Sequence, residues 1–523
     1  MKKVLLALCA LTSLHAQVTE EDLLHGPDQN WLTYVGDYFG QRNSPLKQIT
    51  TVNVNRLVAK WVHHLPETGE LETVPLVFNG VMYATGSNSV YALDAVTGKE
   101  IWHYQPQGTH RRASNRGAAI LGNRIYFTTG DCHLIALERN SGAAFWEHDF
   151  SDHNKAYSCT GAPLVVKDKI IVGLASSGKA CYVAALSAET GEEAWRVWAV
   201  PHPGEPGAET WGKLSLDWAG GPTWTTGTFD PQLNLVYWAT GNPWPDFDGS
   251  SRPGDNLFTD SILAINPDTG KVKWHFQFVP HDTHDWDANE TPVLYDGEFR
   301  GKPRKLLLQA NRNGFYYVLD RETGQFLHGV PFVKELNWAS GLDDSGRPLV
   351  VKNTDPSPGG VRVCPSVHGA TNWWAPSLNP DEGLFFVVAL EECEIYYSSE
   401  QQPVPNGGYR GTGHTSIPSE PGSFYLRALD ITTGKLRWER RMPGPTTMWA
   451  GTVATAGGLV FSADDDGDLV AFDQKTGKDL WHFYMGSNLK GSPMTFSVAR
   501  RQYVTVAAGT DLFTFGLMGP SDE

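Results

Sequence analysis

The chain has 523 residues and a formal net charge of −16, from 58 acidic and 42 basic side chains. This acidic balance argues against nucleic acid and anionic membranes as partners, because both carry negative charge. After the N-terminus, no stretch reaches the ~20 apolar residues that a membrane-spanning helix needs, so we expect no membrane span.

A secretion signal is predicted over residues 1–16. Two lysines precede an apolar run from Val4 to Leu14, and His15 and Ala16 stand before Gln17. The run is too short to cross a membrane, although an uncleaved anchor is the alternative interpretation. We expect export to the periplasm if the source is bacterial.

One motif, Ala-x-x-x-x-[Thr/Ser]-Gly-x-x-x-Trp, recurs along the chain. Its six copies are Ala92–Trp102, Ala136–Trp146, Ala185–Trp195, Ala264–Trp274, Ala428–Trp438 and Ala471–Trp481. Two weaker copies end at Trp61 and His328, which brings the series to eight. A motif that recurs about every 40–50 residues is typical of a repeat architecture.

Each copy of the motif predicts two short strands joined by a tight turn. The first strand is apolar, the glycine supplies the positive φ of the turn, and the tryptophan ends the second strand. Many short strands without helical periodicity indicate an all-β fold, and sheets stacked radially form a β-propeller. We predict one eight-bladed β-propeller over residues 17–523, with tryptophans docked between neighbouring sheets.

Five cysteines follow the predicted signal, and an oxidising compartment favours one or two disulfides among them. The first expectation is Cys364–Cys393 and the second is Cys159–Cys181, which would leave Cys132 free. The sequence contains no Cys-x-x-Cys-His motif, so we expect no covalently attached c-type haem.

Two intervals between motif copies are long enough for an insertion. Pro201–Asp255 is rich in Gly, Pro and Trp, and Asn337–Gly422 is rich in Gly, Pro, Asn and Ser. Long loops without periodicity are usually functional or disordered. Because these two carry several tryptophans, we expect ordered loops over a pocket at the mouth of the central channel.

The densest polar cluster is Pro280–Glu290, which holds four carboxylates and two histidines. Carboxylates at this density suit a hard cation such as Ca²⁺, and a carboxylate beside a metal can act as a general base. A solvated acidic loop is the alternative. Asn242 could add a carbonyl oxygen and Arg312 could hold a carboxylate or a quinone oxygen, although both stand in sequences that ordinarily form turns.

Taken together, these features resemble the quinoprotein alcohol dehydrogenases. That family consists of periplasmic eight-bladed propellers that hold pyrroloquinoline quinone and a metal ion on the channel axis. The resemblance covers nearly the whole chain after the signal. It begins at Trp31, Tyr34 and Asp37 and ends at the segments 449–452 and 457–461 with the last full motif.

The resemblance implies a role for single residues. The implied cofactor contacts are Glu72, Arg116, Thr160, Trp224, Asn372 and Trp449. Trp224 stands for the tryptophan whose ring stacks under the quinone, and Arg312 for the basic residue near the quinone carbonyl that accepts hydride. Asn242 corresponds to a metal ligand.

The resemblance also implies the catalytic base. An ungapped match makes Asp285 the aspartate that takes the proton from the substrate hydroxyl. Asp287 then falls where lanthanide-using members carry an additional aspartate ligand. A shift by one place would make Asp287 the base instead, and we favour Asp285 because it needs no local gap.

The chain departs from the family in two places. Many members have adjacent cysteines over the quinone where this chain has 110–114 without cysteine, so His110 is expected to cover the cofactor. The usual metal-binding glutamate is missing from Gly173–Lys179. Losing a charged ligand should weaken Ca²⁺ binding, so we expect the metal site to be rebuilt around Asn242, Asp285 and Asp287.

The function implied by the resemblance is oxidation of an alcohol or sugar hydroxyl with pyrroloquinoline quinone and Ca²⁺ or a lanthanide. Because the chain carries no haem motif, the electrons would pass to a separate acceptor such as a cytochrome c. The alternative is a non-catalytic propeller that acts as a binding scaffold of the cell envelope, since propellers host many functions. Substrate identity and oligomeric state do not follow from the sequence.

Overall fold

The computed structural model describes residues 17–108, 110–176, 178–212, 215–399, 410–444, 449–464 and 466–519. The predicted signal over 1–16 lies outside the described residues. The described part is almost entirely β-structure, which confirms the predicted all-β fold. Its only α-helix is α1 (Glu20–Leu24), and three short 3₁₀ turns are η1 (Val54–Arg56), η2 (Ala208–Trp211) and η3 (Leu216–Trp218).

Antiparallel four-stranded sheets follow one another along the described chain. The first four consist of β3 (Leu76–Phe78), β4 (Val81–Thr85), β5 (Val90–Asp94) and β6 (Glu100–Tyr104); β7 (Ala119–Leu121), β8 (Arg124–Thr128), β9 (His133–Glu138) and β10 (Ala144–Asp149); β12 (Leu164–Val166), β13 (Lys169–Gly173), β15 (Tyr182–Ser187) and β16 (Glu193–Trp198); and β17 (Thr228–Asp230), β18 (Leu235–Ala239), β19 (Ser261–Ile265) and β20 (Val272–Gln277). In each, neighbours in sequence pair in order, as expected for strands joined by short turns.

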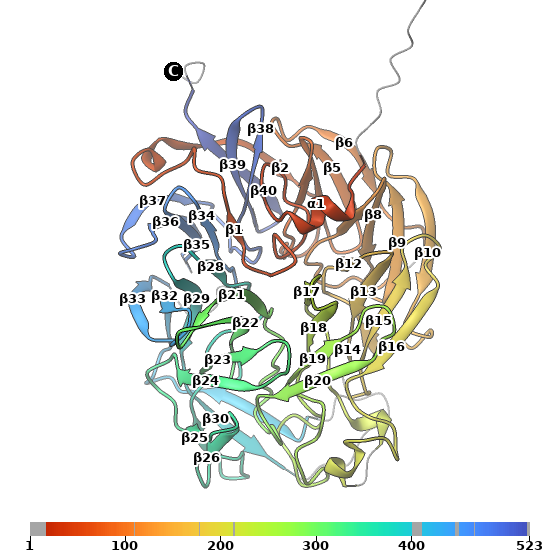
Figure 1. Cartoon of the computed structure of the whole chain (residues 1–523), viewed down its shortest axis with the longest axis vertical. Helices are drawn as coiled ribbons and strands as arrows, with labels where there is room; N and C mark the ends of the chain where they lie inside the picture. Colours follow the sequence, from red (N-terminus) through yellow and green to blue (C-terminus); the bar gives the residue numbers. More distant parts are fainter. Residues whose placement is uncertain are drawn as a thin grey trace, which may run out of the picture.

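Four more sheets complete the series. They consist of β21 (Val293–Phe299), β22 (Lys302–Ala310), β23 (Phe315–Asp320) and β24 (Phe326–Pro331); β28 (Ser377–Asn379), β29 (Leu384–Glu391), β32 (Ser423–Asp430) and β33 (Leu436–Met442); β34 (Val453–Thr455), β35 (Leu459–Ala463), β36 (Asp468–Asp473) and β37 (Asp479–Tyr484); and β38 (Met494–Val498), β39 (Arg501–Ala508), β40 (Asp511–Leu517) and β2 (Leu57–His64). A short strand, β1 (Asn43–Ser44), adds to β34 in parallel. The sheets are arranged around a common axis, with β10, β16, β33 and β37 towards the rim (Figure 1).

The burial pattern explains the motif. The inner strands are apolar and buried, as in β5, whereas the outermost strands such as β6 alternate between partly buried and exposed positions. Apolar inner strands are packed on both faces by neighbouring sheets, so they read as continuous apolar runs. The hydrophobic core therefore lies between adjacent sheets.

The motif tryptophans dock onto the next repeat, as predicted. Indole nitrogens donate to backbone carbonyls of the following motif in the pairs Trp61–Ala95, Trp102–Arg139, Trp195–Pro267, Trp274–Arg321 and Trp438–Gln474. The weak copy also follows the rule, because His328 Nε2 lies 3.1 Å from the carbonyl of Thr433. Six of the tryptophan rings pack against the glycine of the following motif; a Cβ on Gly270, for example, would lie 2.9 Å from Trp195.

The two ends of the chain meet in one sheet. Strand β2, near the N-terminus, pairs with β40, the last strand, in an antiparallel register that joins Leu57 to Leu517. The last motif tryptophan, Trp481, donates to the carbonyl of Leu57 at the start of β2. The final repeat therefore docks onto the first.

The two long intervals contain ordered structure as well as sheet strands. Pro201–Asp255 includes η2 and η3 but also β17 and β18, so the insertion proper is shorter than its interval. Asn337–Gly422 includes β28 and β29 and two small sheets; the small sheets are β25 (Ala339–Leu342) with β26 (Pro348–Val350), and β27 (Val361–Val363) with β30 (Glu394–Ser398) and β31 (Thr412–Ser416). Residues 213–214 and 400–409 lie outside the described part.

One predicted disulfide is confirmed and the other is wrong. Cys364 and Cys393 are bonded. Cys159 pairs with Cys132 rather than with Cys181, and Cys181 is a buried free thiol. The turn between β8 and β9 brings Cys132 beside Cys159, with their Cα atoms 5.1 Å apart, whereas sequence spacing carried no information about that turn.

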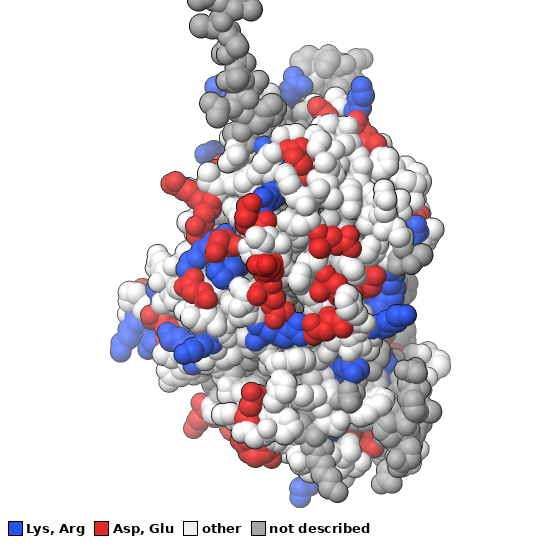
Figure 2. Space-filling model, turned by 90° about the vertical axis from the view of Figure 1, so that its right-hand side faces the viewer, with Lys and Arg blue, Asp and Glu red and all other residues white. Residues whose placement is uncertain are grey.

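Among the described residues, no helix is long and apolar enough to cross a membrane. Acidic and basic side chains are interspersed on the side shown in Figure 2, with several acidic groups near its centre.

Candidate functional site

The predicted site residues lie at one end of the sheets, where strands begin and turn. In a four-stranded antiparallel sheet, the start of the first strand and the turn between the second and third strands are at the same end of the strands. Residues that precede a first strand are Glu72, Arg116, Thr160, Trp224, Asp285, Asp287, Asn372 and Trp449; residues between a second and third strand are Asn242 and Arg312. The topology therefore brings residues from most of the chain to one end of the channel.

Arg116 lies at the centre of the first group of contacts. Its Nη2 lies 2.7 Å from Glu72 Oε2, and its Nη1 donates to Thr160 Oγ1 at 2.7 Å. Its guanidinium carbon is 4.9 Å from the ring centre of Trp224 and 4.1 Å from that of Trp373. A cation that contacts two indole rings in this way is stabilised by their π-systems.

Trp449 joins this group through Trp373. The two rings are stacked, with an interplanar angle of 11° and centroids 6.5 Å apart. Trp373 was missed as a site residue, although the pair 373–374 is conspicuous in the sequence, because a buried tryptophan is ordinarily part of the core.

Arg312 links the aromatic group to the acidic loop. Its Nη2 donates to Asn372 Oδ1 at 2.9 Å and lies 3.5 Å from Asp287 Oδ2, while its Nη1 donates to the carbonyl of Asp285 at 3.1 Å. Its Nε is 3.8 Å from Glu290 Oε1. The fixed guanidinium fork thus organises two carboxylates and an amide at once.

Asp287 is held by three donors. Trp224 Nε1 donates to its Oδ2 at 3.1 Å, alongside Arg312, and the backbone N–H of Asn242 donates to its Oδ1 at 3.0 Å. Gly241 permits this approach, because a Cβ there would lie 1.6 Å from Asp287 Oδ1. The structure therefore brings Asn242 and Asp287 together.

Asp246 is a site residue that the sequence reasoning missed. Asn242 Nδ2 donates to its Oδ1 at 2.7 Å, and its Oδ2 lies 3.4 Å from Arg410 Nη1. The same Arg410 nitrogen lies 3.4 Å from Asp285 Oδ2. Asp246 stands in a proline-rich loop with no periodicity, so only its position four residues after Asn242 could have indicated it.

Burial dominates the electrostatics of these carboxylates. It raises the pKa of Asp285 to about 7, with a further rise from the charge of Asp287 and an opposing effect of Arg410 and Arg312. The pKa of Asp287 is raised by burial against the lowering effect of Arg312. Burial, and then the charge of Asp285, raises the pKa of Asp246 well above its ordinary value. Burial raises the pKa of Glu290 to about 8.

The contacts of His110 lie elsewhere. Its imidazole interacts with Asp131 and packs against His133 on the sheet formed by β7–β10. The described part of Gly173–Lys179 forms the end of β13 and the strand β14 (Ala175–Ser176), which pairs with β11 (Tyr157–Ser158). Ser177 lies outside the described residues. No carboxylate comes from this stretch of the sequence.

The arrangement has two chemical capacities. Stacked aromatic rings with buried arginines suit a planar, anionic ligand. Three carboxylates, of which those of Asp246 and Asp287 are buried and that of Asp285 is partly exposed, lie with an amide in one network. They suit a hard cation that prefers oxygen ligands, and such a cation would relieve their mutual repulsion. The two capacities meet at Asp287, which contacts both Trp224 and Asn242.

Comparison with known proteins agrees with this geometry. The family described as PQQ, glucose/ethanol/alcohol dehydrogenase, β-propeller domain, matches residues 31–334 and 443–504. The quinohemoprotein alcohol dehydrogenase ADH IIB of Pseudomonas putida is 38% identical over 543 residues, which cover 97% of this chain and 78% of that protein.

Two solved structures are similar throughout. The quinohemoprotein alcohol dehydrogenase from Comamonas testosteroni superposes with a TM-score of 0.88 at 34% identity, covering 94% of this chain and 81% of that one. A europium-containing methanol dehydrogenase superposes with a TM-score of 0.84 at 30% identity, covering 94% and 98% respectively.

Proposed function

We propose a specific activity for this chain, which belongs to the family of PQQ-dependent glucose, ethanol and alcohol dehydrogenases. It oxidises the hydroxyl group of an alcohol or a sugar in the periplasm, and it passes the electrons to a separate acceptor such as a cytochrome c. Its eight four-stranded sheets form one closed eight-bladed propeller. The runner-up, a non-catalytic scaffold, would not require the buried arginines and carboxylates of the site.

The unsatisfied arginines carry the proposal. Nε of Arg116 and Nε of Arg312 are buried and have no hydrogen-bond partner among the described residues. A buried donor without a partner costs about 1–3 kcal/mol, and more when it is charged. A planar quinone with carboxylate groups would provide acceptors for both arginines, so the residues present fit this cofactor.

The proposed quinone site uses residues from seven sheets. Trp224 forms the floor; Glu72, Arg116, Thr160 and Asn372 bind the polar edge; Trp449 supports the site through Trp373; Arg312 lies beside Asp285. His110 contacts Asp131 and His133 rather than the residues named above. When bound, the quinone supplies the oxidising group and the metal ion supplies a Lewis acid.

The proposed metal ligands are Asn242, Asp285 and Asp287, with Asp246 in place of the missing glutamate. Asp246 accepts a hydrogen bond from Asn242, and Arg410 lies 3.4 Å from the carboxylates of both Asp246 and Asp285. The carboxylate of Asp246 therefore lies in the same network. It restores the negative charge that the stretch 173–179 lacks. Ca²⁺ affinity follows the charge of the ligands, and a third carboxylate also suits a trivalent lanthanide.

Asp285 is the proposed base that takes the proton from the substrate hydroxyl. Its side chain is 21% exposed, against 10% for Asp287 and 4% for Asp246. Both oxygens of Asp287 already accept hydrogen bonds. A base has to reach its substrate and works best with a pKa near the operating pH, and Asp285 meets both requirements better than Asp287.

The test is a titration of the purified apoprotein with pyrroloquinoline quinone, with Ca²⁺ and La³⁺ in separate experiments. Absorbance reports quinone binding, and dye-linked oxidation of alcohols and sugars reports activity. We expect quinone binding that depends on the metal, followed by turnover. Absence of quinone binding with either ion would favour the scaffold.

The ligand set is tested by calorimetric titration of the metal in the presence of quinone. Asp246→Asn and Asp287→Asn should each weaken metal binding at least tenfold, because each removes a charged ligand. Asp248→Asn, in the same loop as Asp246, is the control and should bind as the wild type does. Full metal affinity in Asp287→Asn would rule out the rebuilt site, and full affinity in Asp246→Asn would remove Asp246 from it.

A further inference from the structure

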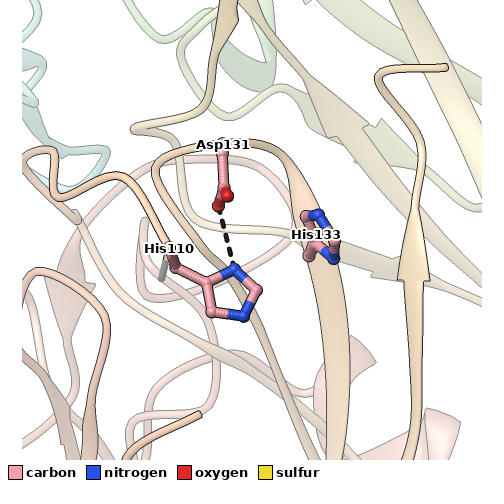
Figure 3. Close-up of side chains that lie close together, drawn as sticks. All are labelled: His110, Asp131 and His133. Carbon is pink, nitrogen blue, oxygen red and sulfur yellow. Dashed lines mark hydrogen bonds and ion pairs between the residues drawn. The ribbon is translucent and has the colours of Figure 1, made fainter. Parts of the chain in front are cut away.

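A second group of metal-ligating side chains lies outside the quinone site. One ring nitrogen of His110, one ring nitrogen of His133 and one carboxylate oxygen of Asp131 lie within 4.8 Å of one another. Figure 3 shows Asp131 pointing toward the imidazole of His110, with His133 beside them. His110 Nδ1 is 3.1 Å from Asp131 Oδ1, and the two imidazole ring centres are 4.9 Å apart.

Glu147 lies beside this group. Its Oε1 lies 2.6 Å from His133 Nδ1 and 3.6 Å from His110 Nε2. In a tetrahedral site with Zn–N bonds of about 2.0–2.1 Å, donor atoms are about 3.4 Å apart. The 3.1 Å between His110 Nδ1 and Asp131 Oδ1 lies close to that value. Glu147 approaches the other ring nitrogen of His110, Nε2, and an imidazole binds an ion through one nitrogen only, so Glu147 is not counted as a ligand of the same ion.

The surroundings have the features of an outer ligand shell. Thr129 Oγ1 donates to Asp131 Oδ1 at 2.6 Å, and Asp149 Oδ2 lies 3.9 Å from His133 Nε2. Hydrogen-bonded carboxylates and hydroxyls of this kind orient metal ligands. The side chains of His110, His133 and Asp131 are 11%, 25% and 30% exposed, so an ion can enter without unfolding the sheet.

The fold places the group between the 110–116 segment and the sheet formed by β7–β10. Asp131, His133 and Glu147 come from one sheet, through the turn before β9, β9 itself and β10. His110 comes from the segment that leads to Arg116 and enters that sheet at β7. Asp131 precedes Cys132, whose disulfide partner Cys159 precedes Thr160. An ion bound here would connect the 110–116 segment to that sheet.

We propose that His110, Asp131 and His133 form a second metal site, which takes a divalent transition metal of the Zn²⁺ class, with water completing the coordination sphere. Two imidazoles and a carboxylate suit that class better than Ca²⁺, which prefers oxygen ligands alone. The site fixes the 110–116 segment and has no part in the redox step. It shares no residue with the proposed Ca²⁺ or lanthanide site.

The test measures Zn²⁺ bound by the full chain in a large excess of Ca²⁺, by competition with a chromophoric chelator. Wild type should bind one equivalent of Zn²⁺ tightly. His133→Asn and Asp131→Asn should each weaken that binding at least tenfold. His482→Asn is the matched control, because His482 forms an exposed pair with Asp468 at 2.9 Å, and it should bind as the wild type does.

A second measurement keeps the proposal falsifiable if a variant folds poorly. Co²⁺ bound to the wild type should show the intense visible bands of a tetrahedral complex, and excess Zn²⁺ should remove them. Equal Zn²⁺ affinity in wild type and His133→Asn, or Co²⁺ spectra of a hexa-aquo ion, would overturn the site. Neither result depends on quinone binding, so failure here and failure of the proposed dehydrogenase activity are distinguishable.

Discussion

At the scale of single residues, the site consists of charged groups that are buried before any ligand is present. Arg116 and Arg312 each combine ion pairs with an unsatisfied Nε, and three aspartates share one network. Such an arrangement costs stability in the empty protein, and binding of an anion and a cation would recover it. Clusters of this kind are characteristic of functional sites.

The first prediction concerns the base. Asp285→Asn should lower kcat by about 10²–10⁴-fold, because the amide cannot take the hydroxyl proton. At saturating metal the quinone titration should change little, because the hydrogen bond between Asp285 and Arg312 runs through the backbone carbonyl of Asp285. The measurement is dye-linked turnover at saturating metal and quinone. Retained turnover in Asp285→Asn, with loss in Asp287→Asn at saturating metal, would assign the base to Asp287.

The second prediction concerns pH. Burial raises the pKa of Asp464 from 3.8 to about 6, so the folded state binds its proton more tightly than the unfolded chain does. The stabilising contribution of this group is complete below about pH 4 and is lost as the pH rises through 6. Asp464→Asn removes the charge and keeps an oxygen that can accept from the N–H groups of Asp466 and Asp468.

The expected result is a difference in thermal midpoint that depends on pH. The thermal midpoint of Asp464→Asn should match that of the wild type near pH 4 and exceed it above pH 7. The gain in free energy of unfolding above pH 7 should be less than about 2 kcal/mol after solvent screening. Calorimetry at both pH values checks this. The same difference at pH 4 and pH 8 would show that Asp464 does not titrate in the fold.

At the scale of elements, the repeated unit is a sheet whose outer strand delivers a tryptophan to the next motif glycine. In most repeats the indole packs on the glycine and donates to a nearby carbonyl, whereas the ring of Trp146 packs on Gly191 without such a bond among the described residues. This explains why the glycine and the tryptophan recur together. The glycine serves both the turn and the packing.

The third prediction separates those two roles. Gly270 has φ of +71° and little space, because its Cβ would meet Trp195 at 2.9 Å. Gly301 has φ of +77°, but nothing lies within 4 Å of its Cβ. Gly270→Ala should destabilise the protein by about 1–3 kcal/mol more than Gly301→Ala, because only the former overpacks. Equal losses in denaturant midpoint would mean that backbone strain alone fixes the glycine.

At the scale of the whole molecule, the pairing of β2 with β40 and the contact of Trp481 with Leu57 join the chain ends. The proposed closed ring removes free sheet edges, which are liable to pair with other chains. It also keeps the residues of the site, which come from many sheets, in a fixed arrangement. The site therefore depends on the integrity of the ring.

The fourth prediction tests closure. Trp438→Ala should destabilise the protein by up to about 3–5 kcal/mol, the cost of truncating a fully buried aromatic residue, because its ring is partly buried. Trp481→Ala should cost about as much, because its ring is also partly buried and docks onto the sheet that contains β2 as the others dock onto the next sheet. Denaturant unfolding of both variants is the measurement. A much smaller loss for Trp481→Ala would indicate an open stack whose last repeat is free.

By itself, the sequence determined the all-β class, the repeated sheets and the docked tryptophans. These follow from local patterns, because strand periodicity and turn chemistry act over a few residues. The grouping of Asn242, Asp287 and Arg312 was implied by the family resemblance alone. Only the tertiary structure decided that Cys132 bonds Cys159, that Asp246 joins the acidic network, and that His110 lies with Asp131 and His133. Those contacts join loops from different positions in the repeats, and the meeting of such loops is decided by how the sheets pack around the axis.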